Sequence, residues 1–443
     1  MTVTPRFITG SPMRHVAVMA ASGAIGLTAV FAVELINLVY VSMLGDQVFT
    51  AAMGFAGVIN FFILSLLIGL MIGVTATVSR TIGAQRMDEA RVLATSSLVL
   101  VIGIVVLVAG LTMVFVEPLL IQLGARDRVL ALAQRYLIIA LPATVFLGAG
   151  MVCSALLRSV GDARRAMMVT LLPAILTAII DPLFIFTFKL GFDGAAIVVL
   201  IARITLFGIG LHGVWRVHHL LARFDSSRLA RDARLLSIVA VPAVITNLAT
   251  PIGAAFVTHT IAAFGASAVA GQATIERLTP VAFGLIHSLS GAVGPVFAQN
   301  LGAKRFDRVR ESLRASLIFM VLAVGVAWLV IAVLQDPLTR FFSLDGQGAQ
   351  MMHAFCSWLS ASFFFMGALF VANSAFNNLG RPLWSTGFNW ARATLGTIPF
   401  AWWGSHYGPV EVLAGQAIGA VIFGTLALAS AFWLTNTLGE QRP

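Results

Sequence analysis

Asp181 lies in the apolar stretch "LTAIIDPLF" and is followed directly by Pro182. A carboxylate inside a bilayer costs about 2.5 to 3.5 kcal/mol on insertion scales, so it is expected to face a cavity or a polar partner. Without water around it, such a carboxylate takes up a proton readily. Pro182 lacks a backbone donor, which leaves the Ala178 carbonyl free and kinks the chain beside the acid. Asp181 is therefore a candidate for coupling to an ion, the alternative being a carboxyl that only holds helices together.

Three other polar residues complete this candidate ion-coupling set. Thr177 lies one helical turn before Asp181 on the same face. Glu34 and Asn37 are three residues apart in "VELINLVYVSMLG" and share a face of another helix. If the two helices pack together, this acid and amide could share a proton or a cation with Asp181. Alternatively, Glu34 makes only an interhelical hydrogen bond. For Asn37 alone, such a structural hydrogen bond is commoner than a role in ion binding.

The C-terminal half offers different polar residues inside apolar runs. Glu276 and Arg277 in "GQATIERLTPV" are adjacent, so they point in different directions on a helix and are not expected to pair with each other. With Asn247 and Asn373, they are candidates for lining a substrate cleft. An ion pair to another helix is the alternative for the charged residues, and the same two interpretations apply to Arg203 and Arg392.

The elements that carry these residues are membrane spans. Of the 443 residues, 59% are hydrophobic and 10% are charged, far from the roughly 25% charged residues of soluble domains. Apolar runs such as "SLVLVIGIVVLVAGLTMVFV" are long enough to cross a bilayer as helices, and no pattern of short alternating strands predicts a barrel. The first residues are expected to be a polar leader and not a cleaved signal. Cys153 and Cys356 both lie in apolar runs, which predicts neither a disulfide nor a metal site, and no cofactor is expected.

The fold class predicted is an all-α integral membrane protein with twelve transmembrane helices. The predicted spans cover residues 16–43, 52–79, 92–116, 130–157, 166–188, 194–221, 236–263, 270–298, 314–335, 348–377, 383–404 and 410–437. With a cytoplasmic N-terminus, most Lys and Arg residues outside the spans fall on the cytoplasmic side, and only Arg126, Arg128, Lys189 and Arg340 fall on the other. The positive-inside rule then places both termini in the cytoplasm. It also explains the net charge of +10 without a nucleic-acid partner.

The chain contains an internal repeat at a shift of about 219 residues. "VSRTIGAQRMDEAR" (78–91) aligns with "FAQNLGAKRFDRVR" (297–310), and Gly161 aligns with Gly380. The predicted organisation is an N-terminal six-helix lobe (1–221), a cytoplasmic linker (222–235) and a C-terminal six-helix lobe (236–443). Two such lobes in the same orientation, with a central cleft, are typical of secondary transporters.

Four segments in the right order resemble the multidrug and toxic compound extrusion (MATE) family. They are "MLGDQVFTAAMGFAG", "LLRSVGDARRAM", "DPLFIFTFKLGFDGAA" and "GPVFAQNLGAKRFDRVR". The resemblance implies export of organic cations or amphipathic drugs in exchange for protons or sodium ions. It assigns the ion to the N-terminal lobe, with the family's fifth-helix aspartate at Asp181. Its partner asparagine becomes Thr177, its first-helix aspartate becomes Asn37, and a sodium-binding threonine becomes Val199, so the resemblance favours protons over sodium.

The sequence thus predicts a bacterial plasma-membrane antiporter that is not an enzyme and works on small molecules, with a monomer sufficient for activity. Two alternatives stay open. One is a lipid-linked oligosaccharide flippase of the same superfamily, which the intramembrane arginines would suit. The other is a membrane subunit without transport, for which no catalytic motif is present.

Overall fold

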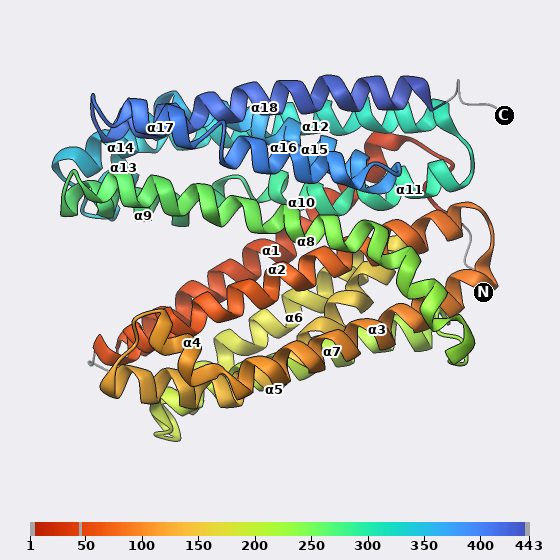
Figure 1. Ribbon diagram of the computed structural model, residues 1–443, viewed down its shortest axis with the longest axis horizontal. Coiled ribbons are helices and arrows are strands. Elements are labelled where there is room, and N and C mark those ends of the chain that lie inside the picture. The colour runs from red at the N-terminus through yellow and green to blue at the C-terminus, as the bar shows by residue number, and fades with distance from the viewer. Residues whose placement is uncertain (1–4, 44–46, 439–443) are drawn as a thin grey trace. The chain divides into compact units, whose positions relative to one another are not determined.

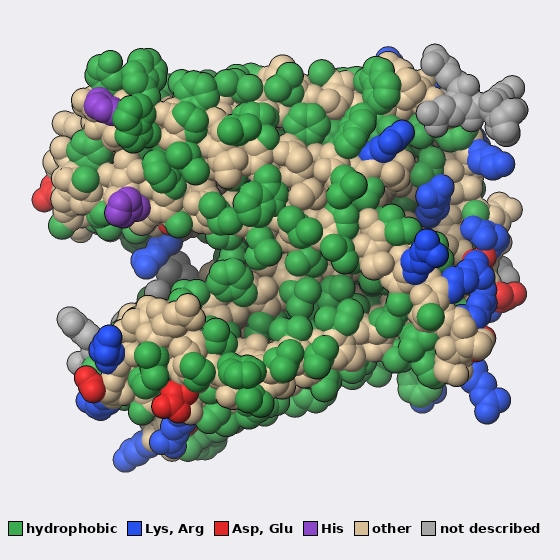
Figure 2. Space-filling model, viewed as in Figure 1, with side chains coloured by type: hydrophobic (Ala, Val, Ile, Leu, Met, Phe, Trp, Pro, Cys, Tyr) green, Lys and Arg blue, Asp and Glu red, His purple; other side chains and the backbone are tan. Residues whose placement is uncertain are grey.

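The computed structural model describes residues 5–43 and 47–438. Every regular element within them is a helix, and ten helices are long and apolar enough to cross a membrane. An eleventh span results if the pair Ala266–Ala282 and Gly284–Gly302, bent by 55°, counts as one crossing. Figure 2 shows apolar side chains along the helices and most Lys and Arg side chains near helix ends, as expected for helices surrounded by lipid.

Two compact units divide the chain. Unit 1 consists mainly of residues 25–240, and unit 2 of residues 6–24 and 241 onward. Helix α1 (Pro12–Ser42) therefore begins in unit 2 and ends in unit 1, and α8 (Ser226–Ala262) begins in unit 1 and ends in unit 2. The segment 222–235, predicted as a linker, thus includes the first turns of α8, and residues 6–24 belong with the C-terminal half of the chain.

Unit 1 is built around one central helix, and its elements can be followed in Figure 1. Besides parts of α1 and α8, it contains α2 (Gln47–Gly83), α3 (Met87–Val114), α4 (Val116–Gln122), α5 (Asp127–Ser159), α6 (Ala163–Pro182), the π-helical turn η1 (Leu183–Thr187), α7 (Gly191–Leu211) and the π-helical turn η2 (His212–Val217). Helix α5 packs against α2, α3 and α7.

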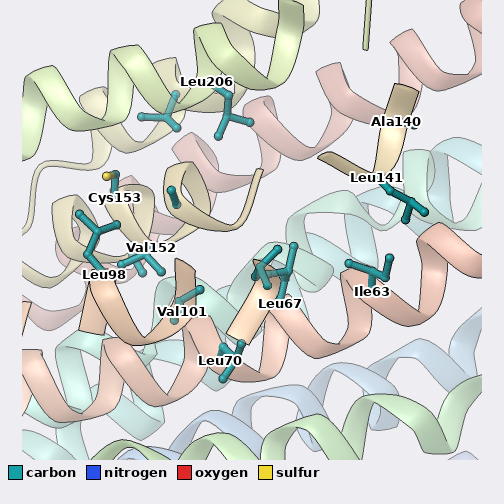
Figure 3. Packing of buried hydrophobic residues seen from close by; sticks show 14 of the residues in the cluster. Ile63, Leu67, Leu70, Leu98, Val101, Ala140, Leu141, Val152, Cys153 and Leu206 are labelled. Carbon is teal, nitrogen blue, oxygen red and sulfur yellow. The ribbon is translucent and has the colours of Figure 1, made fainter. Parts of the chain in front are cut away.

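Small residues allow α5 to occupy this central place. A Cβ atom added at Gly150 would lie 3.1 Å from the backbone nitrogen of Phe207, so α5 and α7 approach to backbone distance there. Such close approach is how helices gain packing energy in lipid, where apolar burial alone favours no partner. Figure 3 shows the apolar core around α5, in which Leu67 of α2 and Leu206 of α7 are buried.

Unit 2 has the corresponding helices with more interruptions. They are α9 (Ala266–Ala282), α10 (Gly284–Ala292), α11 (Gly294–Gly302), α12 (Phe306–Val333), α13 (Gln335–Phe341), α14 (Gly346–Ser357), the 3₁₀ turn η3 (Leu359–Ser362), α15 (Phe363–Asn378), α16 (Pro382–Ala393), α17 (Ile398–Gly404) and α18 (Pro409–Thr437). The predicted span 383–404 is split into α16 and α17, and neither piece alone is long enough to cross a bilayer. Pro399 at the start of α17 has no N–H to continue the helix, which accounts for the break.

The turns repeat with the same backbone geometry at a constant shift. Residues with positive φ come in pairs 219 positions apart: Gln85 and Lys304 (60° and 55°), Gly124 and Ser343 (103° and 50°), Asp127 and Gly346 (both 47°), and Gly161 and Gly380 (80° and 90°). Positive φ is uncommon for residues other than glycine, so four matched pairs do not arise by chance. The two halves therefore share one local fold, as the aligned sequence motifs predicted.

Candidate functional site

The Asn37 and Asp181 side chains meet in unit 1. Asn37 Nδ2 of α1 donates a hydrogen bond of 2.9 Å to Asp181 Oδ2 of α6. Asp181 is fully buried and Asn37 nearly so. Asp181 Oδ1 and the amide oxygen Oδ1 of Asn37 are buried and have no hydrogen-bond partner among the described residues. Two predicted site residues that are 144 positions apart in the sequence are thus brought together. An oxygen of the acid stays available for a further hydrogen bond.

The backbone around Asp181 is irregular. Helix α6 ends at Pro182, and the chain continues as the π-helical turn η1 before α7 begins at Gly191. Pro182 removes one helical hydrogen bond, and a π turn places carbonyls in positions that a regular helix does not offer. Asp181 therefore lies where the helix changes from α to π geometry, and in a membrane span such irregular backbone is tolerated only inside protein or beside a cavity.

Thr177, another predicted ion-coupling residue, does not join this contact. The Thr177 hydroxyl is buried but donates to the Pro173 carbonyl of its own helix at 2.9 Å, so it is not a partner of Asp181. Val199 lies on α7, which packs against α6, and contributes no oxygen. The side chain of Glu34 lies outside the described part of the structure, so its proposed role stays a prediction.

In unit 2, α16 turns its polar face inward. Ser385, Asn389 and Arg392 are buried, whereas Leu383 is 70% exposed. The Asn389 amide donates a 2.9 Å hydrogen bond to Asn373 Oδ1 of α15. A helix with its polar face buried and its apolar face outward is the arrangement suited to lipid. The predicted cleft residue Asn373 is consequently part of a buried polar seam between α15 and α16.

Arg392 extends this seam toward α8. Its NH2 group donates to the Thr250 hydroxyl at 3.2 Å, and its Nε is buried with no hydrogen-bond partner in the described part of the chain. On α8 the Asn247 amide donates to the Ala243 carbonyl one turn earlier at 2.7 Å. The predicted candidates on α9 are apart from these contacts. Glu276 is exposed and accepts from Gln272 Nε2 at 2.9 Å, and Arg277 is exposed.

Comparison with known proteins identifies the family. The MatE family model matches residues 24–183 and again residues 242–403, so each half of the chain carries one copy. The chain belongs to the MatE family. It is 30% identical to the FAD transporter of Shewanella oneidensis over 95% of this chain and 94% of that protein. It is 26% identical to the probable multidrug resistance protein NorM of Thermotoga maritima, over 72% of this chain and 69% of that protein.

Solved structures agree with this assignment. A crystal structure of the Vibrio cholerae MATE transporter VcmN, in a mutant form, has a TM-score of 0.91 at 25% identity and covers 97% of this chain and 98% of that chain. The fold predicted for a MATE transporter is confirmed, as is the prediction that the protein is a membrane transporter and not an enzyme.

A polar cluster that the sequence patterns did not predict lies at one end of unit 1 of the transporter. Asp162 caps the N-terminus of α6 by accepting from the Arg165 backbone N–H at 3.1 Å. Its Oδ2 also accepts from Arg165 NH1 at 2.6 Å and contacts His218 Nε2, just beyond η2, at 2.8 Å. Burial would raise the pKa of Asp162, but the hydrogen bonds from His218 and Arg165 outweigh it and hold that pKa well below its usual range. The "GDARR" string signals only the helix cap, because His218 is 56 residues away.

We expect Asp162→Asn to lower the thermal stability of the purified transporter, because removing a charge-assisted hydrogen bond from a largely buried group costs about 1.5 to 3 kcal/mol. A depressed folded-state pKa stabilises the fold above the ordinary carboxyl pKa of about 4, and this contribution is lost as pH falls toward the folded value. Melting curves from pH 5 to 8 should therefore show a constant deficit relative to wild type. Equal melting temperatures would contradict the assignment.

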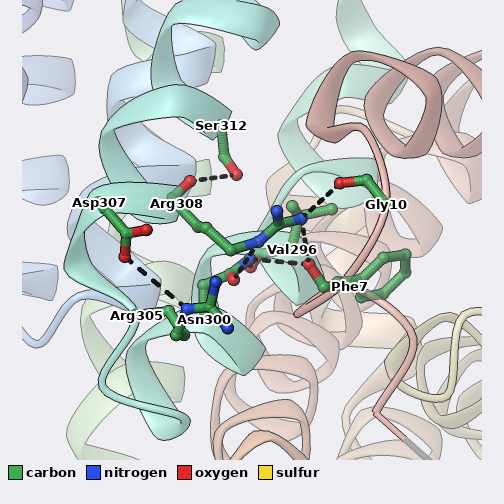
Figure 4. Close-up of polar contacts among 8 residues, drawn as sticks. All are labelled: Phe7, Gly10, Val296, Asn300, Arg305, Asp307, Arg308 and Ser312. Atoms are coloured by element: carbon green, nitrogen blue, oxygen red, sulfur yellow. Dashed lines mark hydrogen bonds and ion pairs between the residues drawn. The ribbon is translucent and has the colours of Figure 1, made fainter.

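A second missed cluster anchors the N-terminal segment within unit 2 (Figure 4). The Arg308 guanidinium donates to the Phe7 carbonyl at 3.2 Å and to the Gly10 carbonyl at 2.9 Å. Asn300 Nδ2 also donates to the Phe7 carbonyl, and the Phe7 N–H donates to Gln299 Oε1. Arg308 belongs to the basic motif at residues 297–310, which the positive-inside rule explained only as a determinant of membrane topology. Its guanidinium binds backbone carbonyls, which explains how residues 6–24 become part of unit 2.

Proposed function

We propose that this transporter exports small amphipathic compounds across the bacterial plasma membrane in exchange for protons, by alternating access, with both termini in the cytoplasm. The observation that carries the proposal is the buried hydrogen bond between Asn37 and Asp181. It joins the first and fifth spans of the N-terminal half through a carboxyl group that can exist in two protonation states. The coupling ion and the transported compound can then bias the same helix contact.

Protonation would weaken that contact. A hydrogen bond to a carboxylate is roughly twice as strong as one to a neutral acceptor, so a proton on Asp181 loosens the link between α1 and α6. Entry of a proton from outside would thus shift these helices and promote outward release. The cycle repeats when Asp181 loses its proton toward the cytoplasm.

The surrounding groups favour a proton over sodium. A sodium ion needs several oxygen ligands, as hard cations generally do. Here the amide donor of Asn37 faces the carboxylate, the Thr177 hydroxyl bonds its own helix, and Val199 has no side-chain oxygen. A single carboxylate oxygen without a partner among the described residues suits one proton better than a coordinated metal ion.

Organic cations and other amphipathic drugs are one substrate class, supported by the similarity to the probable multidrug resistance protein NorM of Thermotoga maritima. A flavin dinucleotide is the second candidate, because the Shewanella relative of 30% identity is named an FAD transporter. The intramembrane arginine Arg392 favours this candidate, since a dinucleotide carries phosphate charges that a cation can neutralise.

The test is transport by purified protein in liposomes, with ethidium and FAD as separate substrates under an imposed pH gradient or an imposed sodium gradient. We expect the pH gradient alone to drive accumulation of at least one substrate, and the sodium gradient at constant pH to drive none. Transport driven only by sodium would refute proton coupling. Protein-free liposomes correct for leakage of the substrates.

A further inference from the structure

Arg392 is a buried cation without a buried acid to balance it. The side chain is 5% exposed, and no carboxylate of the described residues lies within ion-pair distance of it. Its guanidinium donates the 3.2 Å hydrogen bond from NH2 to Thr250, and Nε has no partner among the described residues. Charged side chains at membrane depth normally pair with one another or mark a binding site, because an unbalanced charge is costly there.

The guanidinium lies beside an exposed residue, although most of the Arg392 side chain is buried. Thr250, which accepts from its NH2 group, is an exposed residue of α8. Asn247 lies three positions earlier on the same face of α8 and is only half-buried. The tip of Arg392 therefore contacts the Thr250 hydroxyl, and the Asn247 amide lies one turn earlier on the same helix. Both groups can bind an anionic oxygen.

The helix break immediately after Arg392 adds to the site. Helix α16 ends at Ala393 and α17 begins at Ile398, so the segment predicted as one span is interrupted by a short turn. The Thr397 hydroxyl donates to the Arg392 carbonyl at 3.0 Å and holds the turn against the arginine. Discontinuous helices of this kind in transporters commonly lie beside substrate or ion sites.

The two units place opposite charges between corresponding pairs of helices. In unit 1, α1 and α6 meet at Asn37 and the acid Asp181. In unit 2, the helices related by the 219-residue shift, α8 and α16, meet at Thr250 and the base Arg392. The same scaffold therefore carries a group that can bind a proton in one unit and a permanent cation in the other, since arginine keeps its charge under all relevant conditions.

We propose that Arg392, with Thr250 and Asn247 at its rim, binds the anionic group of a transported organic anion, a phosphate or a carboxylate, and so determines selectivity for anionic over neutral or cationic compounds. This inference rests on the proposed transport function and specifies its substrate class. A planar guanidinium binds such groups through two parallel N–H donors, and the free Nε provides one donor in that geometry.

The test compares FAD with riboflavin, which has the same ring system but no phosphate. Binding to purified protein is measured by quenching of flavin fluorescence, and transport is measured in liposomes. We expect Arg392→Met to weaken FAD binding by about 30-fold or more and riboflavin binding by less than about threefold, because a charge-assisted bond of about 2 kcal/mol is lost only for the phosphate. Arg392→Lys should retain part of the FAD affinity, because it keeps the charge and loses the two-pronged geometry.

Two more variants keep the result interpretable if Arg392→Met fails to fold. Thr250→Val removes the hydroxyl beside the guanidinium and should weaken FAD binding by about three- to tenfold. Arg340→Met removes an exposed arginine of α13 in the same unit and should leave FAD binding unchanged. Equal loss of FAD and riboflavin in folded Arg392→Met, or wild-type FAD affinity in both Arg392→Met and Thr250→Val, would overturn the proposal.

The outcome also separates this inference from the proposed function. Wild-type protein that exports ethidium under a pH gradient but binds no FAD would refute the anion site and leave proton-coupled export standing. FAD binding that depends on Arg392 without transport under a pH gradient would support the anion site and refute the coupling.

Discussion

Asp181→Asn is expected to reduce proton-driven export by about 100-fold or more while leaving the transporter folded and inserted. Asparagine has nearly the same shape as aspartate but cannot gain or lose a proton in this pH range, so the helix contact between α1 and α6 no longer responds to the gradient. A 100-fold loss corresponds to about 2.7 kcal/mol of free energy by which protonation of Asp181 biases the α1–α6 contact. The measurement is initial transport rate in liposomes under a fixed pH gradient.

Asp88→Asn is the matched control for Asp181→Asn. Asp88 lies in the same unit, its side chain is 99% exposed, and its 3.3 Å pair with Arg91 spans a single helical turn. Such exposed pairs contribute little, so this variant should transport at a rate within about twofold of wild type. If Asp181→Asn transports at the wild-type rate under a pH gradient, Asp181 does not carry the coupling proton.

Gly419→Ala is expected to destabilise unit 2 strongly, because the added methyl group has no space. A Cβ at Gly419 of α18 would overlap the carbonyl group of Gly396 and lie 2.8 Å from its Cα. These are backbone atoms that cannot rotate away, so the cost should reach or exceed the usual range of about 1 to 3 kcal/mol for overpacking. Since Gly396 belongs to the turn between α16 and α17, FAD binding at Arg392 should weaken too.

A fluorescence-detected melting curve of purified protein would measure this effect, with Gly325→Ala as control. Gly325 lies in α12 of the same unit, and an added Cβ there meets no atom within 4 Å. We expect the control to match or slightly exceed wild-type stability, because alanine is the better helix former. A melting temperature for Gly419→Ala equal to that of Gly325→Ala would show that α18 does not pack at backbone distance against the turn between α16 and α17.

Long-range pairing decided which polar residues form sites. Asp181 and Asn37 could be proposed as partners because each interrupts an apolar run, where a polar group must be satisfied by another helix. The structure brings those two together but directs Thr177 to its own helix, a choice that depends on side-chain rotation and not on helical spacing. Arg392 shows the same limit, because the sequence identifies a charge inside a span without indicating whether an acid faces it.

The clusters at the helix ends show why the basic motifs were only partly understood. Arg308 was predicted to set topology, since positive charge near a span is sufficient for that role. Its contacts with Phe7 and Gly10 involve residues about 300 positions away. They use backbone carbonyls, which every residue has, so the residue types do not predict these contacts. His218 likewise reaches Asp162 only because η2 ends beside the start of α6.

Local sequence was sufficient to predict the membrane environment, the order of the apolar segments and their number apart from two broken spans, and the duplication. Each of these follows from local hydrophobicity or from repeated residues at a constant shift. Three features emerged only once the helices were placed in space: the break after α16, the membership of residues 6–24 in unit 2, and the buried acid and buried arginine between corresponding helix pairs of the two units. In lipid every span is apolar on most of its surface, so helix pairing depends on close-packed glycines and on the few polar groups that must find partners, and both are settled only when helices meet.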